Sequence, residues 1–193
     1  IFTESIRRIC SALGETGLAG LEQQVLERLV HSSGDLSIGD LLRFSAGACE
    51  AGVDALRAGA LILTDTEMAA AAVRPMASRT LGASVRTVLE WAPSIAPVGS
   101  TRTAAGMDAA WHQLEADRPA PIVLIGSAPT ALEVLLKLVA EGAALPTLVI
   151  GMPVGFVGVA ESKRHLAESG LTQIRLDGTR GGAGLAGAAL NSL

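Results

Sequence analysis

Two short apolar segments, 122–125 (IVLI) and 147–150 (TLVI), most constrain the fold of this chain. Each is a run of β-branched and aliphatic residues without charge, which is typical of a strand buried on both faces. Their starts are 25 residues apart, and the intervening segment 127–142 has the length and apolar spacing of a single helix. A strand, a helix and a strand at this spacing predict a right-handed parallel crossover, which is the repeating unit of an α/β sheet.

The same alternation extends along the rest of the chain. No linker or low-complexity tract interrupts it, so we predict a single domain over residues 1–193. Its architecture should be α/β, a three-layer sandwich with a mainly parallel sheet of about five strands flanked by helices. The further strands are expected at 60–65, 84–90 and 173–176. The helices are expected at 1–13, 21–30, 41–59, 100–116, 127–142, 157–170 and 181–193.

An uncharged run from 142 to 160 has the length of a membrane span. Pro146 and Pro153 interrupt it, as do Gly151, Gly155 and Gly158. This spacing predicts a short strand, a loop and the start of a helix instead of one continuous helix. We therefore expect no contact with a membrane.

Composition excludes several classes of function. The net charge of −4, with no run of Lys and Arg, argues against nucleic-acid binding, which needs a basic surface. Cys10 and Cys49 form neither a disulfide framework nor a metal-ligand spacing, so we expect reduced thiols, no metal and a reducing compartment. No signal peptide is recognisable, and we predict a cytoplasmic protein.

The ligand site of such a sheet is expected beyond the carboxyl ends of its strands. Four segments follow those ends, namely TDTEM (64–68), GSAPT (126–130), GMPVGF (151–156) and DGTRGG (177–182). Glycines there allow a ligand to approach the backbone, and the N–H groups that open the next helices favour anions. We expect these N–H groups to bind carboxylates of the ligand.

A few side chains stand out by their position. His31 closes the second helix, where it is either an ordinary last-turn residue or a catalytic group, whereas His112 and His165 are expected on the surface. Arg102 lies at a helix start, where it either faces solvent or binds an anionic ligand. The segment GAGLAG (182–187) fits a dinucleotide fingerprint, but no acidic residue follows about 20 positions later, so close helix packing or carboxylate binding explains it better.

Six sequence blocks carry a resemblance to a known family. In chain order they are RLVHSSGD, AGALILTDTEMA, GSTRTAAG, GSAPTALEVLLKLVAEG, PTLVIGMPVGFVGVAESKRHLAESG and AALNSL. Together they resemble the precorrin-8X methylmutase (precorrin isomerase) family, with its cobalt-precorrin-8 counterpart, over nearly the whole chain. The resemblance implies a Rossmann-like homodimer that holds a corrinoid, a tetrapyrrole, near the subunit interface. It also implies methyl migration from C11 to C12 of the ring without a cofactor.

The same resemblance assigns residues to the site. His31 matches the catalytic histidine, which would hydrogen-bond to or protonate the pyrrolic system. This chain departs from the family where Ser127 replaces an Asn, and where Thr179 and Ala183 stand near the double glycine. Such departures leave a non-catalytic tetrapyrrole-binding or carrier protein as a second hypothesis, with a nucleotide-binding enzyme as the third. The predicted substrate-binding residues are Ser32, Ser33, Asp65, Glu67, Thr101, Arg102, Ser127, Thr130, Val154, Gly155, Phe156, Gly181 and Gly182.

Overall fold

A computed structural model describes residues 1–114 and 116–193 of the chain. The α-helices are α1 (Phe2–Leu13), α2 (Gly20–Ser33), α3 (Ala48–Arg57), α4 (Glu67–Thr80), α5 (Arg102–Leu114), α6 (Pro129–Ala140), α7 (Val159–Glu168) and α8 (Ala183–Leu190). The strands are β1 (Leu42–Phe44), β2 (Ile62–Thr64), β3 (Val85–Thr87), β4 (Ile122–Ile125), β5 (Leu148–Gly151) and β6 (Gln173–Leu176). Two 3₁₀ helices, η1 (Leu36–Asp40) and η2 (Val88–Glu90), complete the described elements.

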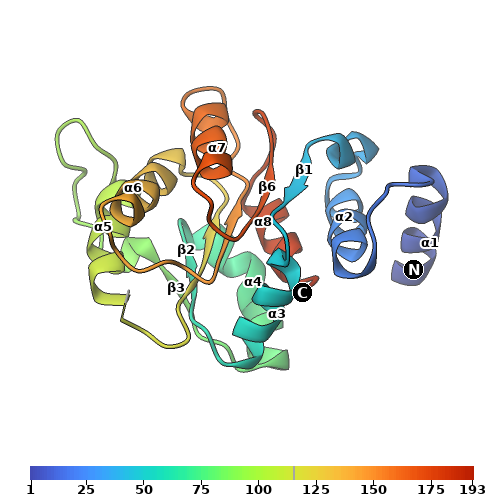
Figure 1. Cartoon of the computed structure of the whole chain (residues 1–193), viewed down its shortest axis with the longest axis horizontal. Helices are drawn as coiled ribbons and strands as arrows, with labels where there is room; N and C mark the ends of the chain where they lie inside the picture. The colour runs from blue at the N-terminus through green and yellow to red at the C-terminus, as the bar shows by residue number, and fades with distance from the viewer. Residues whose placement is uncertain (115) are drawn as a thin grey trace.

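All six strands belong to one sheet with the order β1-β6-β5-β4-β2-β3 (Figure 1). The pairs β2–β3, β2–β4, β4–β5 and β5–β6 are parallel, and β1 pairs with β6 in the antiparallel direction. The predicted crossover is present, since β4 and β5 are adjacent and parallel, with Ile122 opposite Leu148. The α/β sandwich expected from the sequence is therefore confirmed.

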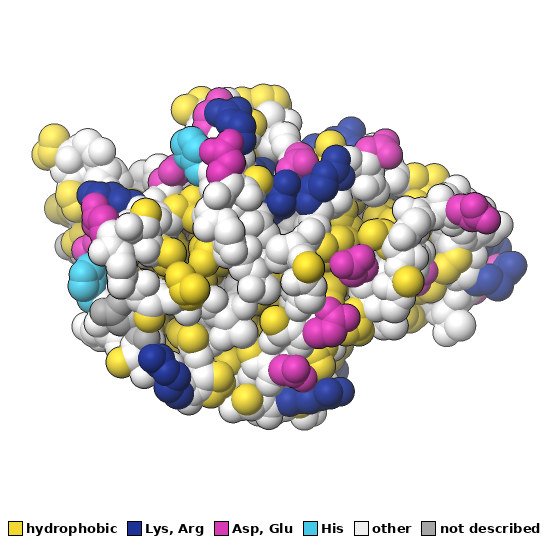
Figure 2. Space-filling view, in the orientation of Figure 1, with side chains coloured by type: hydrophobic (Ala, Val, Ile, Leu, Met, Phe, Trp, Pro, Cys, Tyr) yellow, Lys and Arg dark blue, Asp and Glu magenta, His cyan; other side chains and the backbone are white. Residues whose placement is uncertain are grey.

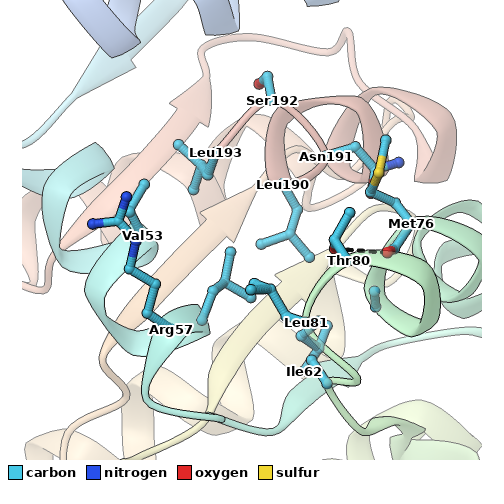
Figure 3. A pocket seen from close by; sticks show the side chains of 13 residues that line it. Val53, Arg57, Ile62, Met76, Thr80, Leu81, Leu190, Asn191, Ser192 and Leu193 are labelled. Carbon is cyan, nitrogen blue, oxygen red and sulfur yellow. Dashed lines mark hydrogen bonds between the residues drawn. The ribbon is translucent and has the colours of Figure 1, made fainter.

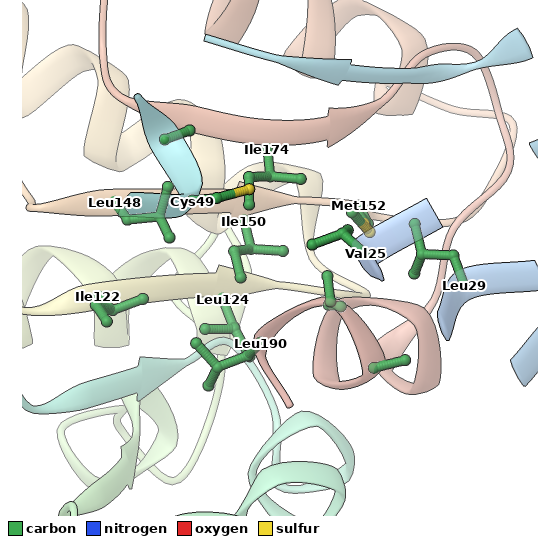
Figure 4. Packing of buried hydrophobic residues seen from close by; sticks show 14 of the residues in the cluster. Val25, Leu29, Cys49, Ile122, Leu124, Leu148, Ile150, Met152, Ile174 and Leu190 are labelled. Carbon is green, nitrogen blue, oxygen red and sulfur yellow. The ribbon is translucent and has the colours of Figure 1, made fainter. Parts of the chain in front are cut away.

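Helices cover both faces of the sheet, because the central strands are apolar on both sides. Ile122 and Leu124 face one cluster, in which α3, α4 and α8 lie against the sheet and α2 packs outside α8 (Figures 1 and 4). Val123 and Ile125, one residue out of phase, face the second cluster, built with α5, α6 and α7. The sheet is thus the middle of three layers.

Helix α8 packs closely on α4, and glycine makes the approach possible. A Cβ atom at Gly187 would lie 2.6 Å from Cβ of Ala72. The GAGLAG segment therefore supports helix packing, as its sequence context indicated.

The prediction of a helix over 41–59 is wrong for residues 41–47. Residues Leu42–Phe44 form the edge strand β1, and the helix begins only at Ala48, after Gly47 with φ of 71°. The sheet consequently has six strands. The predicted strand 84–90 is also shorter, because Thr87 and Glu90 form a capping box that turns residues 88–90 into η2.

The uncharged run 142–160 folds as predicted into a loop, strand β5, a second loop and the start of α7. Within the described residues, no helix combines the length and apolarity needed to cross a bilayer.

Candidate functional site

The loops that follow β2, β4, β5 and β6 gather at one edge of the sheet, since these four strands are neighbours and run parallel. Most of the predicted site residues lie on these loops or on the helix starts beside them. Hydrogen bonds hold these loops to one another.

Asp65 binds the loop after β4. Its side chain is fully buried, and Oδ2 accepts hydrogen bonds from the backbone N–H groups of Gly126 (3.0 Å), Ser127 (2.6 Å) and Ala128 (2.7 Å). Burial raises the pKa of this carboxyl group, and the three N–H donors oppose that rise by favouring the ionised form. Asp65 thus fixes the conformation of the β4–α6 loop.

The loops after β5 and β6 are also joined by backbone contacts. The N–H of Gly182 donates to the carbonyl oxygen of Met152 (2.8 Å), and that of Gly155 donates to Thr179 (3.1 Å). Gly181 lies so close to Met152 that a Cβ atom would overlap the carbonyl oxygen of that residue. These glycines therefore permit the approach of one loop to another.

This arrangement corrects one expectation from the sequence. We expected the N–H groups at these strand ends to bind carboxylates of a ligand. At positions 126, 127, 128, 155 and 182, the N–H groups instead donate to Asp65 or to the neighbouring loop. Any anion recognition by these loops must therefore use side chains or other backbone groups.

Hydroxyl groups connect the starts of α5 and α6. Thr101 caps α5, because its Oγ1 accepts from the N–H of Ala104 (3.1 Å). Its hydroxyl also lies 2.8 Å from that of Thr130 in the first turn of α6. Next to it, Arg102 is exposed and donates from Nε to the carbonyl oxygen of Pro93 (2.8 Å), which ties the loop 91–101 to the helix start.

Glu67 lies in the first turn of α4, the helix that follows β2. It is exposed and pairs with Arg74 at 2.9 Å. This contact holds its carboxylate on the α4 surface.

Apolar side chains on the β5–α7 loop point to solvent. Phe156 is 92% exposed, Val157 is 88% exposed and Val154 is half exposed. Three adjacent exposed hydrophobic groups are unusual on a loop of a soluble domain and indicate a surface that contacts a ligand or another chain. On the face shown in Figure 2, positive and negative side chains are intermixed, and this face has no basic stripe of the kind found on nucleic-acid-binding proteins.

His31 lies in the last turn of α2, as its position in the sequence predicted, and Gly34 ends the helix in the left-handed conformation (φ 68°). The imidazole is exposed, and its Nδ1 lies 2.9 Å from the hydroxyl oxygen of Ser5 on α1. Phe2, also on α1, meets the ring edge-to-face with centroids 5.1 Å apart. Two predicted substrate-binding residues follow His31 in the sequence. The hydroxyl of Ser33 donates to the carbonyl oxygen of Leu29 (2.9 Å), and Ser32 is exposed.

The end of α2 is linked to the strand-end loops by an ion pair. Arg180, on the β6–α8 loop, donates to the carboxylate of Asp35 (2.6 Å) and to the hydroxyl of Ser37 (2.6 Å), just after α2 ends. The predicted residues therefore form two groups, one around His31 and one at the strand ends, and the Arg180–Asp35 pair connects them.

A separate pocket of about 340 Å³ lies at the amino end of β2, between α3, α4 and the end of α8 (Figure 3). Leu56, Ile62, Leu81 and Leu190 give it an apolar lining, with Arg57 at one side. The predicted site residues do not line this pocket. Within the described part of the chain, no cluster of His, Cys, Asp and Glu has the arrangement of a metal site.

Comparison with known proteins relates this geometry to a family. The family described as precorrin-8X methylmutase matches residues 1–193, which is the entire chain. The chain belongs to the precorrin-8X methylmutase family. Among its relatives, a precorrin-8X methylmutase of Pseudomonas aeruginosa is 38% identical over 100% of this chain and 93% of its own. A cobalt-precorrin-8 methylmutase of Synechocystis sp. is 35% identical with the same coverage.

Solved methylmutase structures share the fold. The precorrin-8X methylmutase of Thermus thermophilus superposes with a TM-score of 0.87 at 39% identity, covering 98% of this chain and 93% of that one. A structure described as a precorrin-8X methylmutase related protein gives a TM-score of 0.81 at 27% identity, with 97% of both chains covered. The assignment made from the six sequence blocks is therefore confirmed.

Two features of the candidate site were not predicted. Ser5 and Phe2 contact His31 from 26 and 29 positions away in the sequence, and neither forms a motif with it. Lys163 is buried beneath the β6–α8 loop, and here a signal exists. It falls four residues after Val159 and three before Leu166, both buried, so helical spacing places it on the inner face of α7.

Proposed function

We propose that this chain moves a methyl group from C11 to C12 of precorrin-8X, or of cobalt-precorrin-8, to form hydrogenobyrinic acid or its cobalt analogue. Membership in the methylmutase family establishes the reaction type, an isomerisation within one molecule. The geometry of His31 is the observation that supports a catalytic role for this residue in the reaction. Its ring is exposed, and one nitrogen is already engaged by Ser5.

The Ser5 contact bears on what His31 can do. If the hydroxyl donates to Nδ1, the neutral imidazole carries its proton on Nε2 and can donate it to an acceptor. A pyrrolic nitrogen or an adjacent ring atom of the corrinoid is such an acceptor. Hydrogen bonding or protonation there draws electron density from the ring and promotes migration of the methyl group.

The remaining predicted residues would bind and orient the macrocycle. Arg102, with the hydroxyl groups of Thr101, Thr130 and Ser127, can pair with the carboxylate side chains of the substrate. Phe156 and Val154 present apolar surface to the flat ring. Ser32, Ser33, Glu67 and the backbone at Gly155, Gly181 and Gly182 would complete the contacts.

Asp65 would act indirectly. Its carboxylate is buried and holds three N–H groups of the β4–α6 loop, so it keeps Ser127 and Thr130 in place. Such preorganisation lowers the entropic cost of orienting the substrate.

We also propose that the chain is a homodimer and that its site lies near the subunit interface. The exposed side chains of Val154, Phe156 and Val157 support this proposal, because a second copy or the bound corrinoid would remove them from water. Replacing Phe156 by Ser should then lower the dimer affinity, measured by light scattering across a dilution series. Two free cysteines are consistent with a cytoplasmic location, which we propose as well.

The decisive experiment follows the visible spectrum after the protein is mixed with precorrin-8X and, separately, with cobalt-precorrin-8. Conversion to the product chromophore supports the mutase assignment and identifies the substrate. A rapid spectral change on binding without subsequent conversion contradicts it and leaves a tetrapyrrole-binding protein.

The His31→Ala variant assigns the catalytic group. We expect it to bind the corrinoid but to convert it at least about 100-fold more slowly, the usual contribution of a general acid or base. His112→Ala is the matched control, because His112 is exposed near the far end of α5 and bonds to Asp108 of its own helix. Equal turnover by the His31 variant and the control would remove His31 from the mechanism.

A further inference from the structure

Lys163 is a buried cation with backbone partners. Its side chain is 1% exposed, and Nζ donates to the carbonyl oxygens of Gly178 (2.9 Å) and Arg180 (2.5 Å). Burial lowers its pKa from the usual 10.5 to about 8, against the opposing effect of the Asp177 carboxylate. The ammonium group thus lies directly under the β6–α8 loop.

The loop is held to the β5–α7 segment from several directions. Lys163 donates to the carbonyl oxygens of residues 178 and 180. The N–H of Gly155 donates to the carbonyl oxygen of the intervening residue, Thr179. The N–H of Gly182 completes the connection by donating to Met152. Of these contacts, those of Lys163 are the ones made by a side chain, so they can be removed by substitution without altering the backbone.

The same loop carries the connection to His31. The carbonyl oxygen of Arg180 accepts a hydrogen bond from Lys163. Its guanidinium group donates to Asp35 and Ser37, just after the end of α2. A shift of this loop would therefore alter the strand-end group and the His31 group together.

Stability alone does not explain a lysine at this position. Burying an ammonium group has a desolvation cost, and replacement of buried charged groups by apolar residues of similar volume is often neutral or stabilising. The compact ammonium group carries three donors and reaches both carbonyl oxygens at once. The position is better explained by the geometry that it imposes on the loop.

We propose that Lys163 is a positioning residue of the methylmutase site, whose ammonium group holds the 178–182 loop in the conformation required to bind the corrinoid. This inference rests on the proposed function, because it assigns the loop to substrate binding. It assigns no chemical step to Lys163, because the ammonium group is buried and bonded to the loop.

Lys163→Met is the informative variant, since methionine fills a similar volume without a donor. Lys137→Met is the matched control, because Lys137 is the other lysine of the chain and lies exposed on α6. Two quantities would be measured on each protein: affinity for the corrinoid product, by titration of its visible spectrum, and the split of turnover into kcat and KM. We expect at least a tenfold weaker affinity and a higher KM for the Lys163 variant, with kcat less affected, and no change for the control.

A substrate-free measurement separates this inference from the proposed function. Amide hydrogen exchange at Gly155 and Gly182 reports the two backbone contacts of the loop, and it should accelerate in Lys163→Met only. If the wild-type protein neither binds nor converts a corrinoid, the proposed function fails, whatever the exchange shows. If the wild-type protein is active and a folded Lys163→Met variant binds product within twofold of it, the inference is overturned.

A second variant covers the case in which Lys163→Met does not fold. Lys163→Gln keeps an uncharged NH2 donor group at the site on a shorter side chain, and we expect its affinity to lie between those of the wild type and the Met variant. Failure of both variants to fold would overturn the inference, because Lys163 would then be required for stability.

Discussion

The buried ammonium group of Lys163 makes a quantitative prediction about stability and pH. In the folded chain its pKa is lowered from 10.5 to about 8, whereas in the unfolded chain it returns to its usual value. One pKa unit corresponds to about 1.36 kcal/mol, so the difference of about 2.5 corresponds to roughly 3 kcal/mol. The charged form therefore destabilises the fold at neutral pH.

The direction follows from proton counting. Below pH 8 both states bind the proton, and the destabilisation is constant. Between about pH 8 and 10.5 the unfolded chain keeps a proton that the folded chain has lost, so the free energy of unfolding rises with pH. The Lys163→Met variant lacks this contribution.

The assay is urea unfolding of the wild-type protein and Lys163→Met at several pH values from 7 to 10.5. The wild-type free energy of unfolding, relative to that of the variant, should increase by roughly 3 kcal/mol over this range, mostly above pH 8. Other titrating groups are common to both proteins and cancel in the difference, and the chain contains no tyrosine. A difference that stays flat, or that falls as pH rises, would refute the reasoning.

Three further predictions concern other buried or crowded positions. Asp65→Ala should lower the free energy of unfolding, measured in urea, by about 3 kcal/mol or more. The substitution leaves three loop N–H groups without their acceptor, and each such loss costs about 1–3 kcal/mol. Unchanged stability would contradict this role. Gly181→Ala should weaken product binding, since its Cβ atom would overlap the carbonyl oxygen of Met152, whereas Gly184→Ala on the open side of α8 should leave binding unchanged; equal affinities would argue against the close approach. Cys49 is 1% exposed, and burial raises its pKa to about 12, so it should react with a thiol reagent at pH 8 only when urea unfolds the chain; rapid labelling of Cys49 in the folded protein, located by mass spectrometry, would contradict its burial.

Local patterns were sufficient to predict the central part of the fold. The strands at 122–125 and 147–150 are buried on both faces, so their apolar runs are unambiguous, and the glycines and prolines beside them mark the ends. Helix caps depend on equally local contacts. Gly34 and Thr101 act on atoms within four residues, which a local sequence contains.

The edge strand β1 required information from outside its own segment. Its three residues become a strand by pairing with β6, where Arg43 lies opposite Arg175, about 130 positions away. Three residues are too few for an alternating pattern, and the helix that begins at Ala48 supplies apolar residues at helical spacing. The local pattern therefore extended the helix too far toward the N-terminus.

The family resemblance identified the candidate site residues, but the role of the strand-end backbone depended on tertiary contacts. A glycine-rich loop has the same sequence signature whether a ligand or another loop approaches it. Here the space at Gly126 is filled by Ala183, with a Cβ atom at Gly126 falling 2.6 Å from its Cα. The β4–α6 loop thus touches the start of α8 directly at Gly126.

Helix α1 contacts the proposed catalytic residue but buries little of its own surface. None of its residues is fully buried, yet it supplies both Ser5 and Phe2 to the imidazole of His31. Segments that bury little surface detach at a lower free energy than the rest of a protein unfolds. If His31 is catalytic, mild heating or a low urea concentration should therefore release α1 and stop turnover while amide hydrogen exchange in the sheet is unchanged. The working lifetime of the enzyme would then be set by the docking of one peripheral helix, and strengthening that contact would extend it without any change to the core.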